Sequence, residues 1–242
     1  MQIEAEVSLS ELVRNGTLNA EMGAVLWAAA HESISFITAA VPQLAGKSTL
    51  SRAALAMRRP ETPLHRFGGE PAQLDALVRR QLGGYIVVEE FSHAPVPGYI
   101  WGEPVRRVFE ALKSGYSLQA TLHAGSVPEA LNEITHGNRV ADESASQLKL
   151  VLYVERFGTN RANFWRRLVE VYELHKIEDG KPIGHPLYRW RREEDSFEKV
   201  SDPHQFGRDR DLLDQRASVL QRLADDGRTS PGDLSQAAAS LL

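Results

Sequence analysis

The chain has 242 residues, of which 42% are hydrophobic and 25% charged, a composition typical of a folded globular protein rather than of a disordered or fibrous one. Its formal net charge of −4 provides no overall positive field, so nucleic acid is not expected as a partner. The sequence contains no cysteine, which excludes disulfides, thiolate metal sites and a cysteine nucleophile.

Membrane insertion and export find no support in the sequence. The longest apolar stretches, 23–30 and 34–42, are short and are separated by His31, Glu32 and Ser33. The N-terminus, Met-Gln-Ile-Glu-Ala-Glu, is acidic where a signal peptide would be basic. We therefore expect a soluble protein of the cytoplasm.

Helical and strand patterns alternate over the first part of the chain. The predicted helices lie at about 8–14, 19–29, 50–57, 74–82 and 105–113. The predicted strands lie at 33–40, 85–88 and 118–122. Irregular loops rich in proline and glycine are predicted at 58–71 and 91–104. Strands separated by helices indicate a parallel sheet in an α/β fold.

The pattern changes after residue 147. Residues 148–157 and 164–176 are rich in Leu, Val, Tyr and Phe, and a hairpin turn is predicted at 178–181. Two short strands follow at 187–190 and 197–200. Helices at 212–224 and from about 231 close the chain. These patterns predict a β-meander appended to the parallel core, followed by a helical tail.

Half of a phosphate-loop motif lies at the junction between the first strand and the following helix. The motif is Gly, four residues, then Gly-Lys-Ser or Gly-Lys-Thr. Gly46, Lys47 and Ser48 match its second half, whereas Val41 stands where the first glycine belongs. In such loops the backbone N–H groups and the lysine bind phosphates, and the hydroxyl holds Mg²⁺.

Polar residues follow the next two strands. Glu89 and Glu90 end the strand at 85–88, about 40 residues beyond the loop, where a phosphate-loop enzyme keeps its metal-linked and water-activating carboxylates. His123 ends the strand at 118–122, where it could sense a γ-phosphate. Spacing alone also allows a purely structural interpretation. In it, Glu89 and Glu90 are a solvated acidic pair, and His123 is a hydrogen-bonded histidine at the edge of the sheet.

Five segments occur in an order that is specific when they are taken together. They are Gly16-Thr17-Leu18, Leu26-Trp27, Gly46–Leu50, Tyr85–Glu90 and Ala120–Ser126. In this order the chain resembles the secretion ATPase superfamily over roughly residues 10–225. That family powers type II and type IV secretion, type IV pili and archaeal flagella, and the archaeal and pilus-tad branch is the most similar.

The resemblance implies a RecA-like phosphate-loop fold and a division of the chain. A helical lead-in would cover 1–32, the RecA-like core 33–147, an antiparallel β extension of the same domain 148–201, and C-terminal helices 202–242. The implied ATP-binding residues are Gly46, Lys47, Ser48 and Thr49. The implied catalytic residues are Glu90, Glu89 and His123, and the implied Mg²⁺ ligands are Ser48 and Glu90.

The chain departs from the family pattern at the loop. Val41 and Leu44 replace two of the three glycines of Gly-x-x-Gly-x-Gly-Lys. Glu89 replaces the glycine that usually precedes the catalytic Walker B glutamate, which corresponds to Glu90 here. Holding Leu44 in a left-handed conformation would cost about 1–2 kcal/mol, a roughly tenfold loss of affinity. We therefore expect a changed loop whose path is set by Pro42. This change should impair ATP hydrolysis more than ATP binding.

Two functions of different class remain open. The first is a nucleotide-binding subunit of a type II/IV secretion or pilus-type motor, which would bind ATP–Mg²⁺ and hydrolyse it to drive assembly or export. The second is a degenerate, non-hydrolysing homologue that acts as a structural or regulatory partner of an active ATPase.

The implied partners are other copies in a hexameric ring, or secretion and pilus components that include an inner-membrane platform protein. A DNA-translocating motor ranks third because of the acidic charge.

Arginine pairs and histidines complete the set of candidate residues. Arginine forms bidentate contacts with phosphate, and Arg79 and Arg80 lie nearest the Walker B strand in the sequence. The eight histidines show no His-Glu-x-x-His spacing, which argues against zinc.

Overall fold

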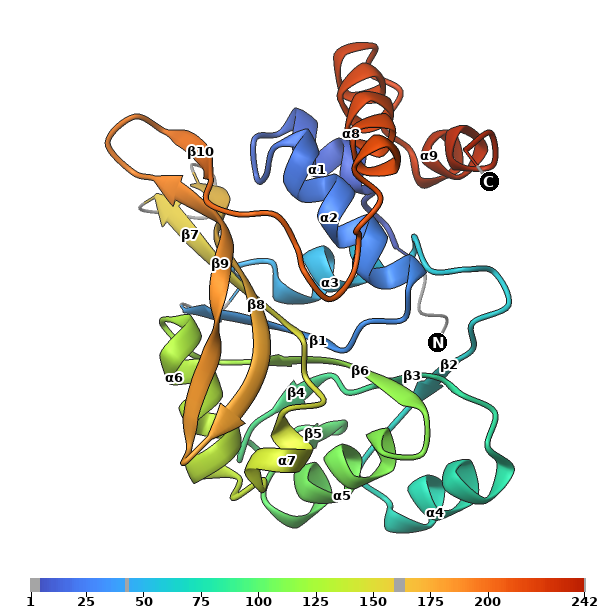
Figure 1. Cartoon of the computed structure of the whole chain (residues 1–242), viewed down its shortest axis with the longest axis vertical. Helices are drawn as coiled ribbons and strands as arrows, with labels where there is room; N and C mark the ends of the chain where they lie inside the picture. Colours follow the sequence, from blue (N-terminus) through green and yellow to red (C-terminus); the bar gives the residue numbers. More distant parts are fainter. Residues whose placement is uncertain (1–4, 42–43, 159–163, 242) are drawn as a thin grey trace.

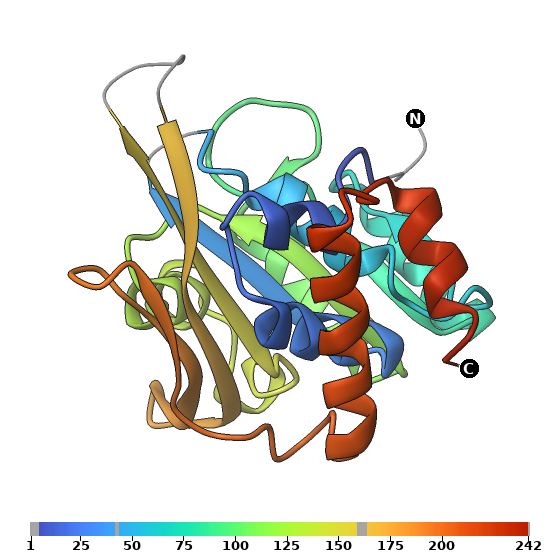
Figure 2. The same cartoon turned by 90° about the horizontal axis from the view of Figure 1, so that it is seen from above.

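A mostly parallel sheet passes through the centre of the molecule, with helices on both of its faces (Figure 1). The computed structural model describes residues 5–41, 44–158 and 164–241. The two N-terminal helices lie beside the long helix at 210–225 over one face of the sheet (Figure 2). This mixed α/β architecture confirms the predicted fold class and is consistent with a RecA-like core.

The strands of the described residues form one ten-stranded sheet. They are β1 (Phe36–Val41), β2 (Leu64–Arg66), β3 (Gly84–Val87), β4 (Glu90–Phe91), β5 (Tyr99–Ile100), β6 (Tyr116–Leu122), β7 (Leu150–Gly158), β8 (Phe164–Glu178), β9 (Lys181–Arg191) and β10 (Ser196–Lys199). The main order is β10-β9-β8-β7-β1-β6-β3-β2, and β4 pairs with β5 and β6. The strands from β7 to β2 run parallel, whereas β8, β9 and β10 are antiparallel additions.

The helices divide between the two faces. They are α1 (Leu9–Arg14), α2 (Ala20–His31), α3 (Lys47–Leu55), α4 (Pro71–Arg80), α5 (Glu103–Leu112), α6 (Val127–Asn132), α7 (Asp142–Ala145), α8 (Arg210–Asp225) and α9 (Pro231–Ala238), with a π-helical turn, η1 (Glu133–Gly137). One hydrophobic core joins α1, α2, α3, α8 and α9 to the sheet, and a second joins α4, α5, α6 and α7 to its other face.

Helices bury the central strands on both faces. Every residue of β6 is buried, and so are the first five residues of β1. A strand covered on both sides has no solvent-facing positions, and the buried part of β1 is apolar apart from Thr38. In β6 the polar residues Ser117, Gln119 and Thr121 alternate with apolar ones although all of them are buried. None of the helices within the described residues is both long and apolar enough to cross a membrane.

The predicted elements agree with the structure, which adds very short strands and, between 127 and 145, the unpredicted helices α6 and α7 and the turn η1. The predicted helices at 8–14, 74–82 and 105–113 correspond to α1, α4 and α5. The segments 58–71 and 91–104, predicted as loops, contain β2 and β5. These strands have two or three residues, too few to produce a periodic pattern, and they form because neighbouring strand edges offer backbone hydrogen bonds.

A β-bulge interrupts the pairing of β8 with β9. The register shifts between Leu174 and Lys176, so that Leu174 pairs with Gly184 and Lys176 with Ile183. His175 is the extra residue of the longer strand. A Cβ atom at Gly184 would overlap the backbone carbonyl oxygen of Glu173, so this close approach requires glycine.

We expect Gly184→Ala to destabilise the protein by about 1–3 kcal/mol, because the added methyl group must push the two strands apart. Gly68→Ala is a matched control, since a Cβ at Gly68 meets no atom within 4 Å. Urea unfolding of both variants compares the same chemical change with and without the overlap. Equal midpoints for the two variants would contradict the close approach at Gly184.

Candidate functional site

A pocket of about 460 Å³ lies where the carboxyl ends of β1, β3 and β6 meet. This edge is where open parallel sheets of α/β proteins place their ligands. The pocket is lined by Leu44, Ala45, Gly46, Lys47, Ser48, Thr49, Glu90, Ser92, Ala94, Val96, Tyr99, His123 and Arg166. Of the residues implied to bind ATP or Mg²⁺ or to act in catalysis, all except Glu89 line this pocket.

Three charged or titratable side chains meet at the base of this pocket. Lys47 Nζ lies 3.4 Å from Glu90 Oε2 and 3.2 Å from both ring nitrogens of His123. His123 Nε2 lies 3.0 Å from the second oxygen of Glu90, Oε1. Lys47 begins α3, Glu90 follows β3 and His123 follows β6, so the parallel sheet supplies one residue from each connection.

Burial makes the pairing of Lys47 with Glu90 important for both residues. Lys47 is 8% exposed and Glu90 is 5% exposed. Desolvation lowers the pKa of Lys47, and the nearby Glu90 carboxylate partly opposes this effect. Glu90 Oε1 is close to His123 but forms no hydrogen bond with it, so one buried oxygen of this carboxylate has unused capacity to accept.

The described part of the loop before α3 has two residues in the left-handed region. Leu44 has φ +63° and Gly46 has φ +96°. Leu44 thus adopts the left-handed conformation, the alternative to the changed loop that was expected, and its side chain is 64% exposed. Pro42, which was expected to set the path of the loop, lies outside the described residues.

The first turn of α3 leaves backbone donors available to a ligand. In the described part of the chain no side chain caps this helix, whose N-cap is Gly46. The first N–H groups of an α-helix have no partner within the helix, and the helix dipole favours negative charge there. Ser48 and Thr49 lie in this turn and are exposed. This end of α3 is suited to an anionic group such as a phosphate.

Glu89 points away from the pocket. Its carboxylate lies 3.1 Å from Arg66 and 3.7 Å from Arg52, and it lines a small separate pocket beside Ser48. Glu89 lies in a bend between β3 and β4, and its side chain takes a different direction from that of Glu90. The structure pairs Glu90 with Lys47 and Glu89 with two arginines.

Arg166 is a pocket residue that the sequence analysis did not single out. It extends from β8 and donates to the backbone carbonyl of Leu44 over 3.2 Å. Its Nε is buried and has no hydrogen-bond partner among the described residues, and burial together with the nearby Arg156 lowers its pKa. Arg79 and Arg80, the candidates from the sequence, are exposed at the end of α4. Only the pairing of β8 beside β7 reveals Arg166, since no local spacing marks it.

No protein-family model matches the chain. Among curated proteins, it is 26% identical over 222 residues to the uncharacterized protein MJ1287 of Methanocaldococcus jannaschii, a match that covers 78% of this chain and 77% of that protein.

Among solved structures, the chain is similar to the VirB11 ATPase of the Brucella suis type IV secretion system in complex with sulphate, with 15% identity, a TM-score of 0.44, and coverage of 61% of this chain and 50% of that one. It is also similar to the Legionella pneumophila ATPase DotB, with 11% identity, a TM-score of 0.42, and coverage of 81% and 54%. The matches thus span about half of these two structures. Both TM-scores lie below 0.5, so these likenesses carry no argument about function.

The buried pair of Lys47 and Glu90 can be tested by stability measurements. We expect Glu90→Gln to lower the free energy of unfolding by about 2–3 kcal/mol, because it leaves a buried ammonium without its counter-charge in a pocket partly open to water. The double variant Lys47→Met with Glu90→Gln should recover most of this loss. Urea unfolding at neutral pH measures all three proteins.

Glu89→Gln is the matched control, since it makes the same change one residue away. The Glu89 side chain is 32% exposed, so losing its ion pairs should cost less than about 1 kcal/mol. Similar losses at the two positions would contradict the distinct burial of Glu90.

Proposed function

We propose that this chain binds ATP–Mg²⁺ in the pocket at the start of α3 and serves as the nucleotide-binding subunit of a type II/IV secretion or pilus-type motor. The observation that carries the proposal is Lys47, held at the base of the pocket next to the uncapped end of α3. A buried cation and free backbone donors facing one cavity form an environment that an anionic phosphate chain would neutralise. The motif order that resembles the secretion ATPase superfamily supports the choice of nucleotide.

The residues present fit a nucleotide phosphate and its magnesium ion. Gly46, Lys47, Ser48 and Thr49 surround the start of α3 and would hold the phosphates. Mg²⁺ prefers oxygen ligands and usually takes only a few from the protein. The exposed Ser48 hydroxyl and the unsatisfied Oε1 of the Glu90 carboxylate supply oxygens of this kind on the same pocket.

The contacts at the base of the pocket suggest how these side chains would act. When bound, ATP supplies a transferable phosphoryl group. Lys47 would exchange its contact with Glu90 for a phosphate oxygen, which frees the Glu90 carboxylate to orient a water molecule and accept its proton. His123, 38% exposed at its side chain, faces the same space and would contact the outer phosphate.

Arg166 would supply part of the positive charge of the nucleotide site from within the same chain. Its guanidinium already contacts the loop carbonyl of Leu44, on the side of the pocket formed by β8. An arginine placed beside a transferring phosphate neutralises charge that develops during the reaction. The proposal includes assembly into a hexameric ring, or with other secretion or pilus components at an inner-membrane platform. Only the resemblance supports this part of the proposal.

The second candidate function is a non-hydrolysing partner of an active ATPase. The observation that favours it is the close contact of Lys47 with both Glu90 and His123, which occupies the lysine and both candidate catalytic groups with one another. In that case the ion pair would be a permanent structural link. The two candidates differ in whether a nucleotide displaces this contact and whether turnover follows.

We expect the wild-type chain to bind ATP–Mg²⁺ in isothermal titration calorimetry and Lys47→Ala to bind about 10- to 100-fold more weakly, because a charge-assisted hydrogen bond to phosphate is lost. Lys113→Ala, which removes a surface lysine paired with Glu110, is the control for the loss of a positive charge. Equal affinity of wild type and Lys47→Ala, or no binding at millimolar ATP, would contradict the proposal.

Phosphate release measured on the same protein separates the two candidates. Turnover that disappears in Glu90→Gln, with ATP binding retained, assigns the motor function. No turnover in the wild type, whether ATP binds or not, favours the non-hydrolysing partner.

Arg166→Ala should weaken ATP–Mg²⁺ binding by about 10-fold or more, since a guanidinium facing the pocket is lost. Arg167→Ala is a control at the adjacent position, because Arg167 pairs with Asp195 over 2.7 Å instead of lining the pocket. Titration calorimetry of both variants tests the assignment, and it would be wrong if the two lost affinity equally.

A further inference from the structure

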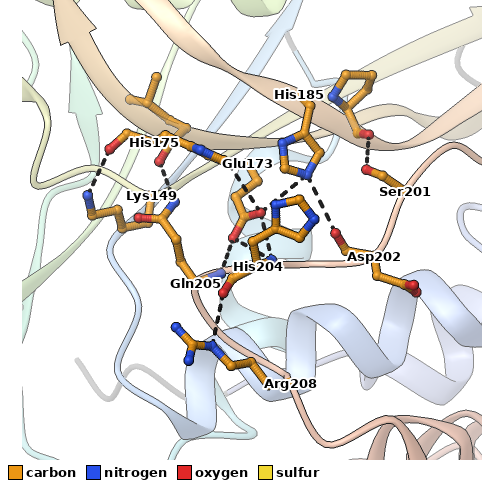
Figure 3. Close-up of polar contacts among 11 residues, drawn as sticks. Lys149, Glu173, His175, His185, Ser201, Asp202, His204, Gln205 and Arg208 are labelled. Carbon is orange, nitrogen blue, oxygen red and sulfur yellow. Dashed lines mark hydrogen bonds and ion pairs between the residues drawn. The ribbon is translucent and has the colours of Figure 1, made fainter.

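Three histidines and a glutamate that are far apart in sequence meet on the antiparallel side of the sheet (Figure 3). Glu173 and His175 belong to β8, His185 to β9, and His204 to the segment between β10 and α8. One possible ligand atom from each residue lies within 4.8 Å of those of the other three. We call this group the histidine cluster.

The sheet register and the β-bulge bring the first three residues together. Glu173 on β8 pairs directly with His185 on β9. The bulge after Leu174 adds His175 to the same side, opposite Gly184. His175 and His185 thereby have ring centroids 4.9 Å apart at an angle of 81°.

Backbone hydrogen bonds to Glu173 place the fourth residue. The N–H groups of His204 and Gln205 donate to the Glu173 carboxylate over 2.9 Å and 2.7 Å. The His204 ring then lies 4.5 Å from that of His185 and 5.8 Å from that of His175. Figure 3 shows the three rings gathered around the carboxylate.

The charge of Glu173 is not matched by a permanent cation in direct contact. Its side chain is 0% exposed, and within the described part of the chain its ion-pair contacts are His175 at 3.7 Å and His185 at 3.4 Å. The ammonium of Lys149 donates instead to the backbone carbonyl of His175, over 3.2 Å. The backbone N–H groups of His204 and Gln205 and the nearby charge of Lys149 offset part of the cost of burying this carboxylate, and a metal ion in direct contact would offset more of it.

The ring nitrogens also have capacity to bind. His175 Nε2 is buried and has no hydrogen-bond partner within residues 5–41, 44–158 and 164–241. His185 Nε2 has a contact of 3.5 Å to the backbone carbonyl of Asp202, at the limit of a hydrogen bond. Protonation of all three rings would bring like charges together at these short separations, whereas neutral imidazoles present lone pairs to one shared cation.

We propose that the histidine cluster binds one zinc ion. Three imidazole nitrogens and one carboxylate oxygen match the preference of Zn²⁺, whereas Mg²⁺ and Ca²⁺ prefer sites made of oxygen alone. Four protein ligands complete a tetrahedral shell, as in structural zinc sites. Tetrahedral bonds of about 2.0–2.1 Å need ligand atoms about 3.3 Å apart, so the cluster closes by small side-chain rotations.

The site has an outer layer of contacts and a route for the ion. Lys149 and Gln205 donate to the backbone carbonyls of His175 and Leu174, which holds the strand and the adjoining segment in place. His204 is exposed, so its ring can move aside to admit the ion. Bound zinc would fasten the segment before α8 to β8 and β9.

Sequence spacing could not reveal this site. The ligands come from two strands and a connecting segment, and only Glu173 and His175 are close in sequence. The argument against zinc from the missing His-Glu-x-x-His pattern applies to two ligands on one helix, whereas here the register of β8 with β9 sets the spacing.

Zinc titration of the full chain, prepared without a histidine tag and stripped with a chelator, tests the proposal in the absence of nucleotide. We expect one Zn²⁺ per chain with a Kd below about 1 µM by calorimetry. Zinc at about 100 times its Kd should raise the Tm by about 5–10 °C. Co²⁺ in place of zinc should give the visible absorption of a tetrahedral complex, and Mg²⁺ and Ca²⁺ should have no such effects.

Variants locate the ion. His185→Ala and His204→Ala should each weaken zinc binding by about 10–100-fold or more. Because His204 is exposed, its variant is the one expected to keep the fold. His136→Ala, an exposed histidine outside the cluster, should bind zinc as the wild type does. A wild-type Kd above about 10 µM would overturn the proposal, and so would unchanged zinc binding in His204→Ala.

Discussion

The pairing of β1 between two parallel neighbours determines where everything else in the molecule lies. β1 hydrogen-bonds to β6 on one side and to β7 on the other, and helices bury both of its faces. The carboxyl end of β1 therefore lies between the loops that follow its parallel neighbours. Lys47, Glu90 and His123 meet there because each follows a parallel strand, although they are up to 76 residues apart.

The same strand joins the parallel core to the antiparallel extension. β7 pairs with β1 in parallel and with β8 in antiparallel fashion, so the sheet continues without a break into the meander. This continuity brings Arg166 to a loop more than a hundred residues earlier in the chain. A single sheet thus supplies the floor of the pocket from its parallel half and one wall from its antiparallel half.

Local sequence patterns predicted the features that depend on neighbouring residues. Gly46, Lys47 and Ser48 could be found because a strand-to-helix junction and its binding residues are contiguous. The α/β class followed from the alternation of helices and strands. The direction of Glu89 and Glu90 could not be predicted, since both follow the same apolar run and only the start of α3 distinguishes them. Arg166 and the histidine cluster depend on strand register, which composition and spacing do not encode.

β8 carries residues of two different places in the protein. Arg166 lies near its beginning and Glu173 lies seven residues later, a distance of about 23 Å along an extended strand. Between them the strand is hydrogen-bonded to β7 on one side and, from Glu170 onward, to β9 on the other. Detaching β8 would break both ladders, so the wall of the pocket and the histidine cluster open together, as one cooperative unit of local unfolding.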